Sequence, residues 1–494
     1  MLEDYFLIVV CVAVLAGLAF VVAGFRQPML FYYGGLFGTA VLKTPELPVV
    51  REKVTIVEVC MLLLWLCWPL LAKGRIRSVM VPQILRLGGA FCVVCLTSSL
   101  LATLTAPPAL QSPKMTAYSL LEAINYCYGV AILWTTVNVL DTWQRWIGAI
   151  AAWLAGMTLA SGVGVAAVVG VAPGWAYEET GRINSTLKNE NQVPSMILPT
   201  LLVAILAAVR IGGGGAARLA MLGVAGAAML TAIGTGSRTA ALMIVLAGVG
   251  VYWVVASATQ VRQVVQSFIL ANLAVVLSGL VVFYFWFAWS RYDGEYSLVK
   301  TPSWQRPAVL LIEWYSGSRN LDDTRPRQIR NAMEYFWNSP VLGTGPKYGS
   351  YYAETGGEVH NTYFSLMLET GFLGLGCFLS LIALAFWEGY RRGRQCPYPW
   401  FAMLSQALLV GLLLLCLYNA TILGLRQRNI WFLLGMIYAF CDLVAAGAVP
   451  SPVMPHWLPR GAYAFFYDTP SRPGTMTAAA PMTIGATGGV GRGQ

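Results

Sequence analysis

Residues 400–422 read WFAMLSQALLVGLLLLCLYNATI, an apolar stretch without Asp, Glu, Lys or Arg. About 20 apolar residues in a helix are enough to cross the hydrocarbon of a bilayer. Comparable runs occur near 5–24, 29–42, 54–72, 82–105, 118–140, 146–172, 193–209, 216–235, 238–257, 264–289, 361–388 and 428–447. The run at 29–42 is short and rich in glycine, which favours a half-span or a re-entrant segment. The sequence therefore predicts an all-α, polytopic membrane bundle of 12–13 transmembrane helices.

The composition supports this class and excludes others. Hydrophobic residues make up 57% of the 494 residues and charged residues 11%, with a net charge of +10; soluble proteins carry roughly a quarter charged residues. The basic residues are scattered over short loops, which argues against a nucleic-acid partner. The acidic start, Met1-Leu2-Glu3-Asp4, is unlike the basic leader of a cleavable signal peptide.

Ten cysteines are present, most of them inside apolar runs. Buried cysteine usually behaves as a small hydrophobe. The pair Cys92 and Cys95 has no histidine nearby in sequence, so we expect neither a disulfide nor a metal site there.

Loop charges predict the orientation of the chain. Short loops rich in Lys and Arg stay cytoplasmic, and Lys73–Arg77 and Arg391–Arg394 are such loops. Alternation then places the loop 173–192, the turn 234–238, the long loop 290–360 and the turn 425–428 on the opposite, outer face. The N-terminus is outside with 13 spans and inside with 12.

Arg238 stands out on the outer face. It lies in the turn Gly234-Thr235-Gly236-Ser237-Arg238, which leaves little room for a carboxylate partner. A guanidinium at the bilayer surface suits bidentate contact with phosphate. The alternative is an arginine that merely snorkels from a helix end. We favour the functional interpretation.

His360 is one of only two histidines, and it precedes a predicted span. A neutral imidazole at a membrane surface can accept a proton near pH 7. Glu369 follows nine residues later, on the opposite face of a continuous helix and about 13.5 Å along it. It should therefore not orient His360. Gly371 and Gly374 are small enough for close helix packing.

The long loop 290–360 contains equal numbers of basic and acidic residues, so most of its charges fit a solvated, salt-bridged cap. Residues 322–333 resemble a helix start with Thr324 as N-cap, and Arg327 and Arg330 would share a face. A helix start with arginines can bind an anion. Asp322 and Asp323 could instead bind a divalent metal, but adjacent acids before a helix are more often capping residues.

Several of these stretches together resemble the O-antigen ligase and Wzy-type polysaccharide polymerase superfamily. His360-Asn361, followed by an acid and two glycines, is similar to its shared motif. Gly236–Ala240 resembles its Ser-Arg-Thr turn, and the stretch from Arg325 to Gly345 resembles another motif. Arg182–Asn191 is similar to a weaker motif, although Lys188–Asn191 departs from the usual Asn-Pro-Asn. The resemblance covers about 175–385.

The resemblance implies a glycosyltransferase in the bacterial inner membrane, with its active site at the periplasmic face. Its donor would be a glycan on undecaprenyl diphosphate and its acceptor lipid A-core or another glycan, with no cofactor and no metal. His360 would be the catalytic base and Arg238 a catalytic residue that stabilises the diphosphate. Diphosphate or glycan binding is expected from Arg182, Lys188, Asn191, Arg319, Arg325, Arg327, Arg330 and Asn361.

The corresponding domain division has four parts: transmembrane helices in 1–289, a periplasmic catalytic loop in 290–360, transmembrane helices in 361–449 and a cytoplasmic, largely disordered tail in 450–494. We expect an O-antigen ligase, with a polymerase as the alternative. A lipid-linked oligosaccharide flippase is the alternative of another class. It would be expected to line a central path with mid-span charges, whereas here the arginines gather at one face.

Overall fold

The computed structural model describes residues 15–41, 55–71, 78–106, 111–178, 182–210, 215–257, 330–331, 333–349, 359–422 and 424–449. For residues 209, 210, 215, 217, 238 and 255–257 it describes only the backbone. All these residues belong to one compact unit, 1–451. The predicted tail, the run 264–289 and most of the long loop lie outside the described residues.

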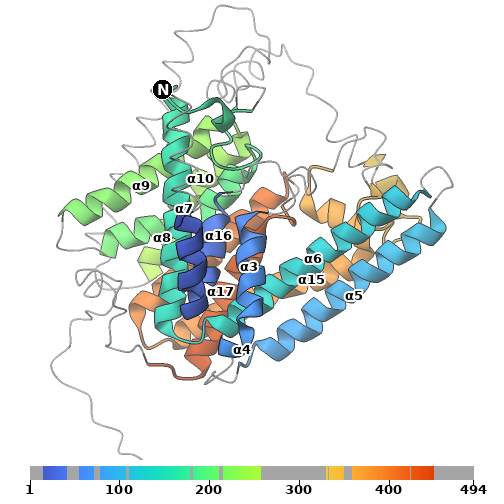
Figure 1. Ribbon diagram of the computed structural model, residues 1–494, viewed down its shortest axis with the longest axis horizontal. Coiled ribbons are helices and arrows are strands. Elements are labelled where there is room, and N and C mark those ends of the chain that lie inside the picture. The colour runs from blue at the N-terminus through green and yellow to red at the C-terminus, as the bar shows by residue number, and fades with distance from the viewer. Residues whose placement is uncertain are drawn as a thin grey trace, which may run out of the picture. The chain divides into compact units, whose positions relative to one another are not determined.

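The described residues are mostly helical and contain no strand, apart from an isolated bridge between Tyr177 and Ile183 (Figure 1). After a first helix at Leu15–Arg26, the helices are α2 (Met29–Gly38), α3 (Ile56–Leu66), α4 (Trp68–Leu71), α5 (Val81–Thr105), α6 (Pro113–Val139), α7 (Trp143–Val168), α8 (Gln192–Arg210), α9 (Gly215–Gly234), α10 (Arg238–Ser257), α15 (Thr362–Gln395), α16 (Pro399–Asn419) and α17 (Arg428–Ala445), with a short 3-10 turn, η2, at Gly174–Ala176. The all-α prediction is confirmed.

Six of these helices are long and apolar enough to cross a membrane: α5, α6, α7, α15, α16 and α17. Five shorter apolar helices accompany them in the described part of the chain. α2 has ten residues and rises about 15 Å, half the hydrocarbon thickness. The prediction of a half-span or re-entrant segment for 29–42 and the total of 12–13 spans both stay predictions.

One predicted run is two helices rather than one. Residues 54–72 divide into α3 and α4 at Cys67, two residues before Pro69. Proline has no N–H and its ring clashes with the carbonyl of the preceding turn, so a helix rarely continues through it. The start of α3 is fixed by a capping box: the Thr55 side chain accepts from the backbone N–H of Glu58, and the Glu58 side chain accepts from the backbone N–H of Thr55.

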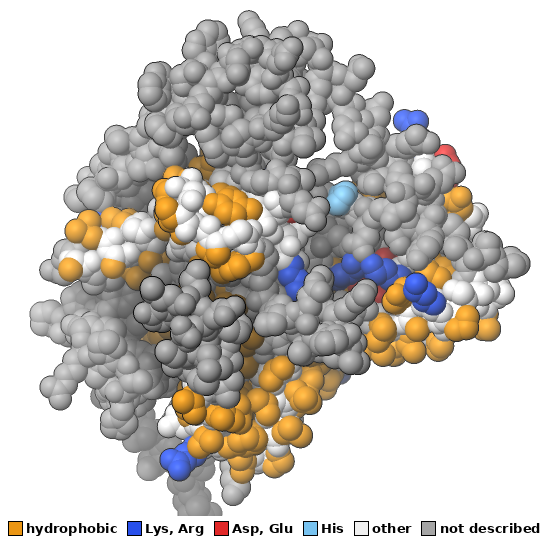
Figure 2. Space-filling view, turned by 45° about the horizontal axis from the view of Figure 1, so that its top comes forward, with side chains coloured by type: hydrophobic (Ala, Val, Ile, Leu, Met, Phe, Trp, Pro, Cys, Tyr) orange, Lys and Arg blue, Asp and Glu red, His pale blue; other side chains and the backbone are white. Residues whose placement is uncertain are grey.

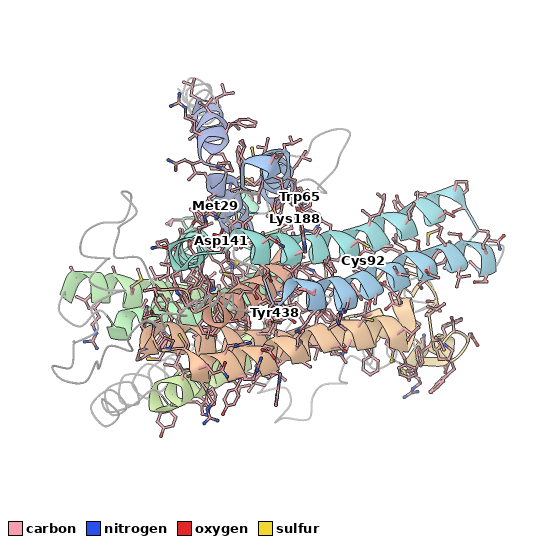
Figure 3. The ribbon with its side chains drawn as sticks, turned by 90° about the horizontal axis from the view of Figure 1, so that it is seen from below. Met29, Trp65, Cys92, Asp141, Lys188 and Tyr438 are labelled. Carbon is pink, nitrogen blue, oxygen red and sulfur yellow. The ribbon has the colours of Figure 1, made fainter. Side chains whose placement is uncertain are left out.

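α17 is the most enclosed of the six long helices. Of its apolar stretch 83% is buried, compared with 33% for α5. It packs against α6 and α15, and Trp146 of α7 donates to the carbonyl of Met436 at 2.8 Å. Tyr438 lies among the packed helices in Figure 3 and donates to the carbonyl of Leu381 in α15. α17 therefore joins the α5–α6–α15 group to α7 and its neighbours.

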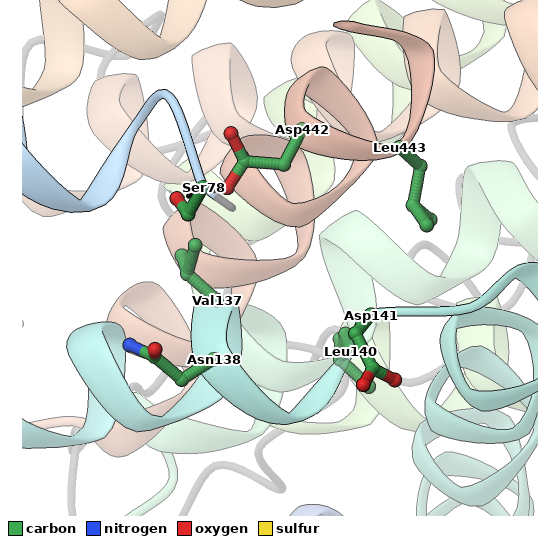
Figure 4. A pocket seen from close by; sticks show the side chains of 7 residues that line it. All are labelled: Ser78, Val137, Asn138, Leu140, Asp141, Asp442 and Leu443. Carbon is green, nitrogen blue, oxygen red and sulfur yellow. Dashed lines mark hydrogen bonds between the residues drawn. The ribbon is translucent and has the colours of Figure 1, made fainter. Parts of the chain in front are cut away.

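A small pocket is lined by Ser78, Val137, Asn138, Leu140, Asp141, Asp442 and Leu443 (Figure 4). In it the Asp442 carboxylate accepts hydrogen bonds from the backbone N–H groups of Val79 and Met80, at 2.8 and 3.0 Å, and from the Ser78 hydroxyl. Asp442 thus caps the start of α5 from another helix. Asp442 lies about 20 Å along α17 from Arg428, so this pocket is remote from the end of the bundle at which α17 begins.

Candidate active site

Hydrogen bonds at one end of the bundle join the loop 182–191, the turn between α9 and α10, the end of α16 and the start of α15. Arg182 Nε donates to the carbonyl of Thr235 at 2.9 Å, which ties the loop 182–191 to the turn between α9 and α10. Tyr418 at the end of α16 donates to the carbonyl of Asn191 at 3.0 Å. Thr362 at the start of α15 donates to the carbonyl of Ile422 at 2.7 Å. The loop 182–191 and the turn 234–238 thus lie together, while their assignment to the outer face of the membrane stays a prediction.

The loop 182–191 is held by a mostly buried ion pair. Arg182 Nη1 contacts Glu190 Oε1, and the two side chains are 19% and 6% exposed. Asn191 donates its amide to the same oxygen at 3.0 Å, and Lys188 in the same loop is partly buried. Burial, together with the neighbouring carboxyl of Glu178, raises the pKa of Glu190 to about 7, against the opposing effect of Arg182.

The turn before Arg238 is built for a sharp reversal. Gly236 has φ 67°, a conformation that favours glycine. The Thr235 hydroxyl accepts from the backbone of Ser237, and the Ser237 hydroxyl accepts from the backbone of Ala240, both at 3.3 Å. Ser237 thereby caps α10, and Arg238 is the first residue of that helix. The Arg238 side chain lies outside the described atoms.

His360 is exposed and stands immediately before α15. Asn361 is the N-cap of this helix, and its Oδ1 accepts from the backbone N–H groups of Tyr363 and Phe364 at 3.0 and 3.1 Å. On the other side of His360, Val359 is buried. The imidazole is therefore presented to the exterior by a backbone that is fixed on both sides.

Glu369 does not contact His360. Its carboxylate accepts from the Tyr126 hydroxyl at 2.6 Å and from the backbone N–H of Lys347 at 3.2 Å. The exclusion of Glu369 as the orienting carboxylate thus agrees with the structure. His360 itself lies before the helix, which begins at Thr362, and α15 is interrupted beyond Glu369, at Gly371 (φ 67°, ψ −170°). Gly371 also does not mediate helix packing: a Cβ there would lie 2.1 Å from the carbonyl oxygen of Val341, in the preceding loop.

Arg426 and Arg428, which were predicted on the outer face but not as site residues, form the turn before α17. Arg426 pairs with Glu122 of α6, and Arg428 pairs with Glu58 of α3 at 3.0 Å. Arg428 also lies over the Tyr128 ring, 4.7 Å from its centroid. An Arg-x-Arg turn between two apolar runs was the sequence signal that could have identified this pair.

Of the remaining arginines predicted to bind the substrate, one is described by the structure. Arg330 is exposed and helical, and residues 333–336 are also helical. Arg319, Arg325 and Arg327 lie outside the described residues, as do Asp322 and Asp323. Figure 2 shows a histidine on a face where basic side chains gather with a few acidic ones. Within the described ranges, no group of three or more His, Cys, Asp or Glu side chains could hold a metal.

The apolar helices and the joined loops define a multi-pass membrane protein with polar, arginine-bearing loops at one end. Residues 219–379 match the model of a protein family described as O-antigen ligase. This match confirms the resemblance to the O-antigen ligase-like superfamily over the segment that contains Arg238, His360 and Glu369. None of the curated proteins compared with the chain matches it.

Proposed function

We propose that the chain is a glycosyltransferase that moves a glycan from undecaprenyl diphosphate to a sugar hydroxyl at the periplasmic face of the bacterial inner membrane. In its favoured form it is an O-antigen ligase that attaches O-antigen to lipid A-core. One observation carries the proposal: the loop 182–191, the turn before Arg238 and the start of α15 after His360 meet at one end of an apolar bundle, in a chain that matches the O-antigen ligase family.

The base in this proposal is His360. Its imidazole removes the proton of the acceptor hydroxyl, whose oxygen forms a bond to the anomeric carbon while the bond from that carbon to the phosphate oxygen breaks. Displacement in one step inverts the configuration and needs no covalent enzyme intermediate. The fixed backbone around His360, with Asn361 as cap and Val359 buried, holds the imidazole in place for this transfer.

The leaving diphosphate needs positive charge, which Arg238 would supply without a metal. Arg330 and Asn361 are proposed to contact the diphosphate or glycan, together with Lys188, Asn191, Arg319, Arg325 and Arg327. Arg182 would act at least partly through the turn, because its Nε and Nη1 are engaged by Thr235 and Glu190. Arg182 would thereby fix the position of the α10 start, where Arg238 lies.

Reconstitution tests the activity. Purified protein in proteoliposomes, with the lipid-linked glycan and lipid A-core on the same side, should transfer glycan, and a chelator should leave the rate unchanged. If transfer is lost with the chelator and restored by Mg²⁺, the metal-free mechanism is wrong and Asp322 with Asp323 becomes the candidate metal site. Movement of the lipid-linked glycan across the bilayer without transfer would instead identify a flippase.

The second candidate function is a Wzy-type polymerase, because the motif around His360 is shared by both kinds of enzyme in the resemblance. The lipopolysaccharide gel of a deletion strain separates them. A ligase predicts core without any O-antigen and accumulation of lipid-linked polymer. A polymerase predicts core that carries one repeat unit.

A further inference from the structure

The break in α15 at Gly371 lies beside the loop 340–345. A helix interrupted in this way leaves backbone N–H and C=O groups without partners inside the helix, and such groups are costly to bury in apolar surroundings. Here the loop supplies the partners. The hydrogen bonds run from Thr344 N to the carbonyl of Leu368 (2.8 Å), from Gly345 N to that of Glu369 (3.0 Å), from Phe372 N to that of Pro340 (2.8 Å) and from Leu373 N to that of Val341 (3.3 Å).

Glycines make the close approach possible. Gly343 and Gly345 in the loop have φ 72° and 93°, and Gly371 in the helix has φ 67°. A Cβ at Gly343 would lie 2.5 Å from the backbone of Glu369 and Thr370. The spacing of glycines on both sides of the contact is therefore explained by backbone docking rather than by helix–helix packing.

The side chain of Glu369 completes the contact. Its carboxylate accepts from the backbone of Lys347, in the same loop, and from Tyr126 of α6. Ser98 of α5 donates to its carbonyl at 2.7 Å. Glu369 is 4% exposed and Tyr126 is 1% exposed, so water competes little for these hydrogen bonds. One residue thus binds the loop, α5 and α6 to α15.

The docked segment also reaches the proposed base. Phe336, within the segment 333–349, packs in one buried cluster with Val359 and Leu368. Val359 is the residue before His360, and Leu368 is the residue before Glu369. A displacement of the segment 333–349 would therefore loosen the backbone next to His360.

We propose that Glu369, with Tyr126, is a positioning residue that holds the segment 333–349 in the break of α15 and thereby fixes His360 for glycan transfer. Glu369 itself touches neither substrate. The docking stands on the hydrogen bonds alone, whereas its kinetic consequence rests on the proposed transferase function.

Hydrogen exchange on the full-length purified protein tests the docking without reference to activity. In Glu369→Leu, which keeps a similar volume and removes the acceptors, exchange at the amides of Thr344, Gly345 and Lys347 should accelerate about 10- to 100-fold, the range for leaving a buried donor without its partner. Glu369→Gln keeps an acceptor for Lys347 and should stay near the wild type. Unchanged exchange in Glu369→Leu would overturn the docking role.

Kinetics in proteoliposomes test the positioning. Glu369→Leu should lower kcat about 10- to 100-fold with a smaller change in the KM for the donor, Glu369→Gln should recover most of the rate, and Tyr126→Phe should lie between them. The matched control is Glu388→Gln, on the same helix but paired with Arg391, which should transfer at the wild-type rate. Accelerated exchange with undiminished transfer would refute the positioning role. Absence of transfer in the wild type would refute the proposed function and leave the exchange result to decide the docking.

Discussion

The carboxyl of Glu190 provides a prediction whose magnitude follows from the structure. Its pKa is raised from the ordinary 4.5 to about 7, first by burial and then by the neighbouring Glu178. The native state therefore holds this proton more tightly than the unfolded chain. The stabilisation is fully present below about pH 4.5 and is lost as the pH rises through about 7. The difference between the two pKa values corresponds to about 3 kcal/mol of folding free energy, most of which is lost between pH 5 and 8.

Glu190→Gln should remove this loss. The glutamine resembles the protonated acid and can still accept from Arg182 and Asn191, which both contact Oε1 in the wild type. Relative to the wild type, the variant should gain about 2–3 kcal/mol at pH 8 and little at pH 5. For a chain of this size we expect a difference in Tm of roughly 3–5 °C at the higher pH.

Thermal unfolding of the purified protein at pH 5 and pH 8 measures the difference. Glu388→Gln, which changes a carboxylate paired with Arg391 and keeps Glu190, should show the pH dependence of the wild type. The reasoning is refuted if Glu190→Gln loses as much stability as the wild type between the two pH values.

Three further changes test separate contacts. Gly371→Ala forces a side chain into a conformation open almost only to glycine and into the docked loop, and should lower the free energy of unfolding by at least about 3 kcal/mol. Gly376→Ala, where a Cβ meets nothing within 4 Å, should unfold at or above the wild-type temperature, and equal Tm values for the two variants would contradict the proposed break in α15. Arg426→Ala leaves the nearly buried carboxylate of Glu122 without its ion pair and should lower the free energy of unfolding by about 3–5 kcal/mol. Adding Glu122→Gln should recover part of this loss, and a double variant no more stable than Arg426→Ala would argue against the ion pair. Arg182→Ala removes the hydrogen bond to the turn before α10 and should reduce transfer about 10- to 100-fold in the proteoliposome assay; transfer at the wild-type rate would show that the turn needs no such support.

Much of the fold was predictable because apolar runs are local signals. The run 400–422 became α16 at Pro399–Asn419, and the run 82–105 became α5 at Val81–Thr105. The division between α3 and α4 was missed although Pro69 marks it, because a hydropathy run does not register the lost hydrogen bond. The break at Gly371 was missed for a different reason. A glycine within an apolar run is also compatible with helix packing, and only the partner loop distinguishes the two.

The candidate site was predictable in part for the same reason. Charge alternation between spans assigned the loops of Arg182, Arg238 and His360 to one face, and helical geometry removed Glu369 from contact with His360. The partners that fix these residues come from distant parts of the chain: Thr235 for Arg182, Tyr126 for Glu369 and Glu122 for Arg426. Such pairs have no periodic signal in a single sequence, so the engaged state of Arg182 could not be predicted.

The most direct test of the central claim is transfer by His360→Ala in proteoliposomes, with donor binding measured on the same preparation. Transfer should be abolished while expression and binding of the lipid-linked donor stay nearly unchanged, because the imidazole acts on the acceptor hydroxyl. Arg238→Ala should instead weaken donor binding or turnover, because its charge acts on the diphosphate. Undiminished transfer by His360→Ala would contradict the assignment of His360 as the base.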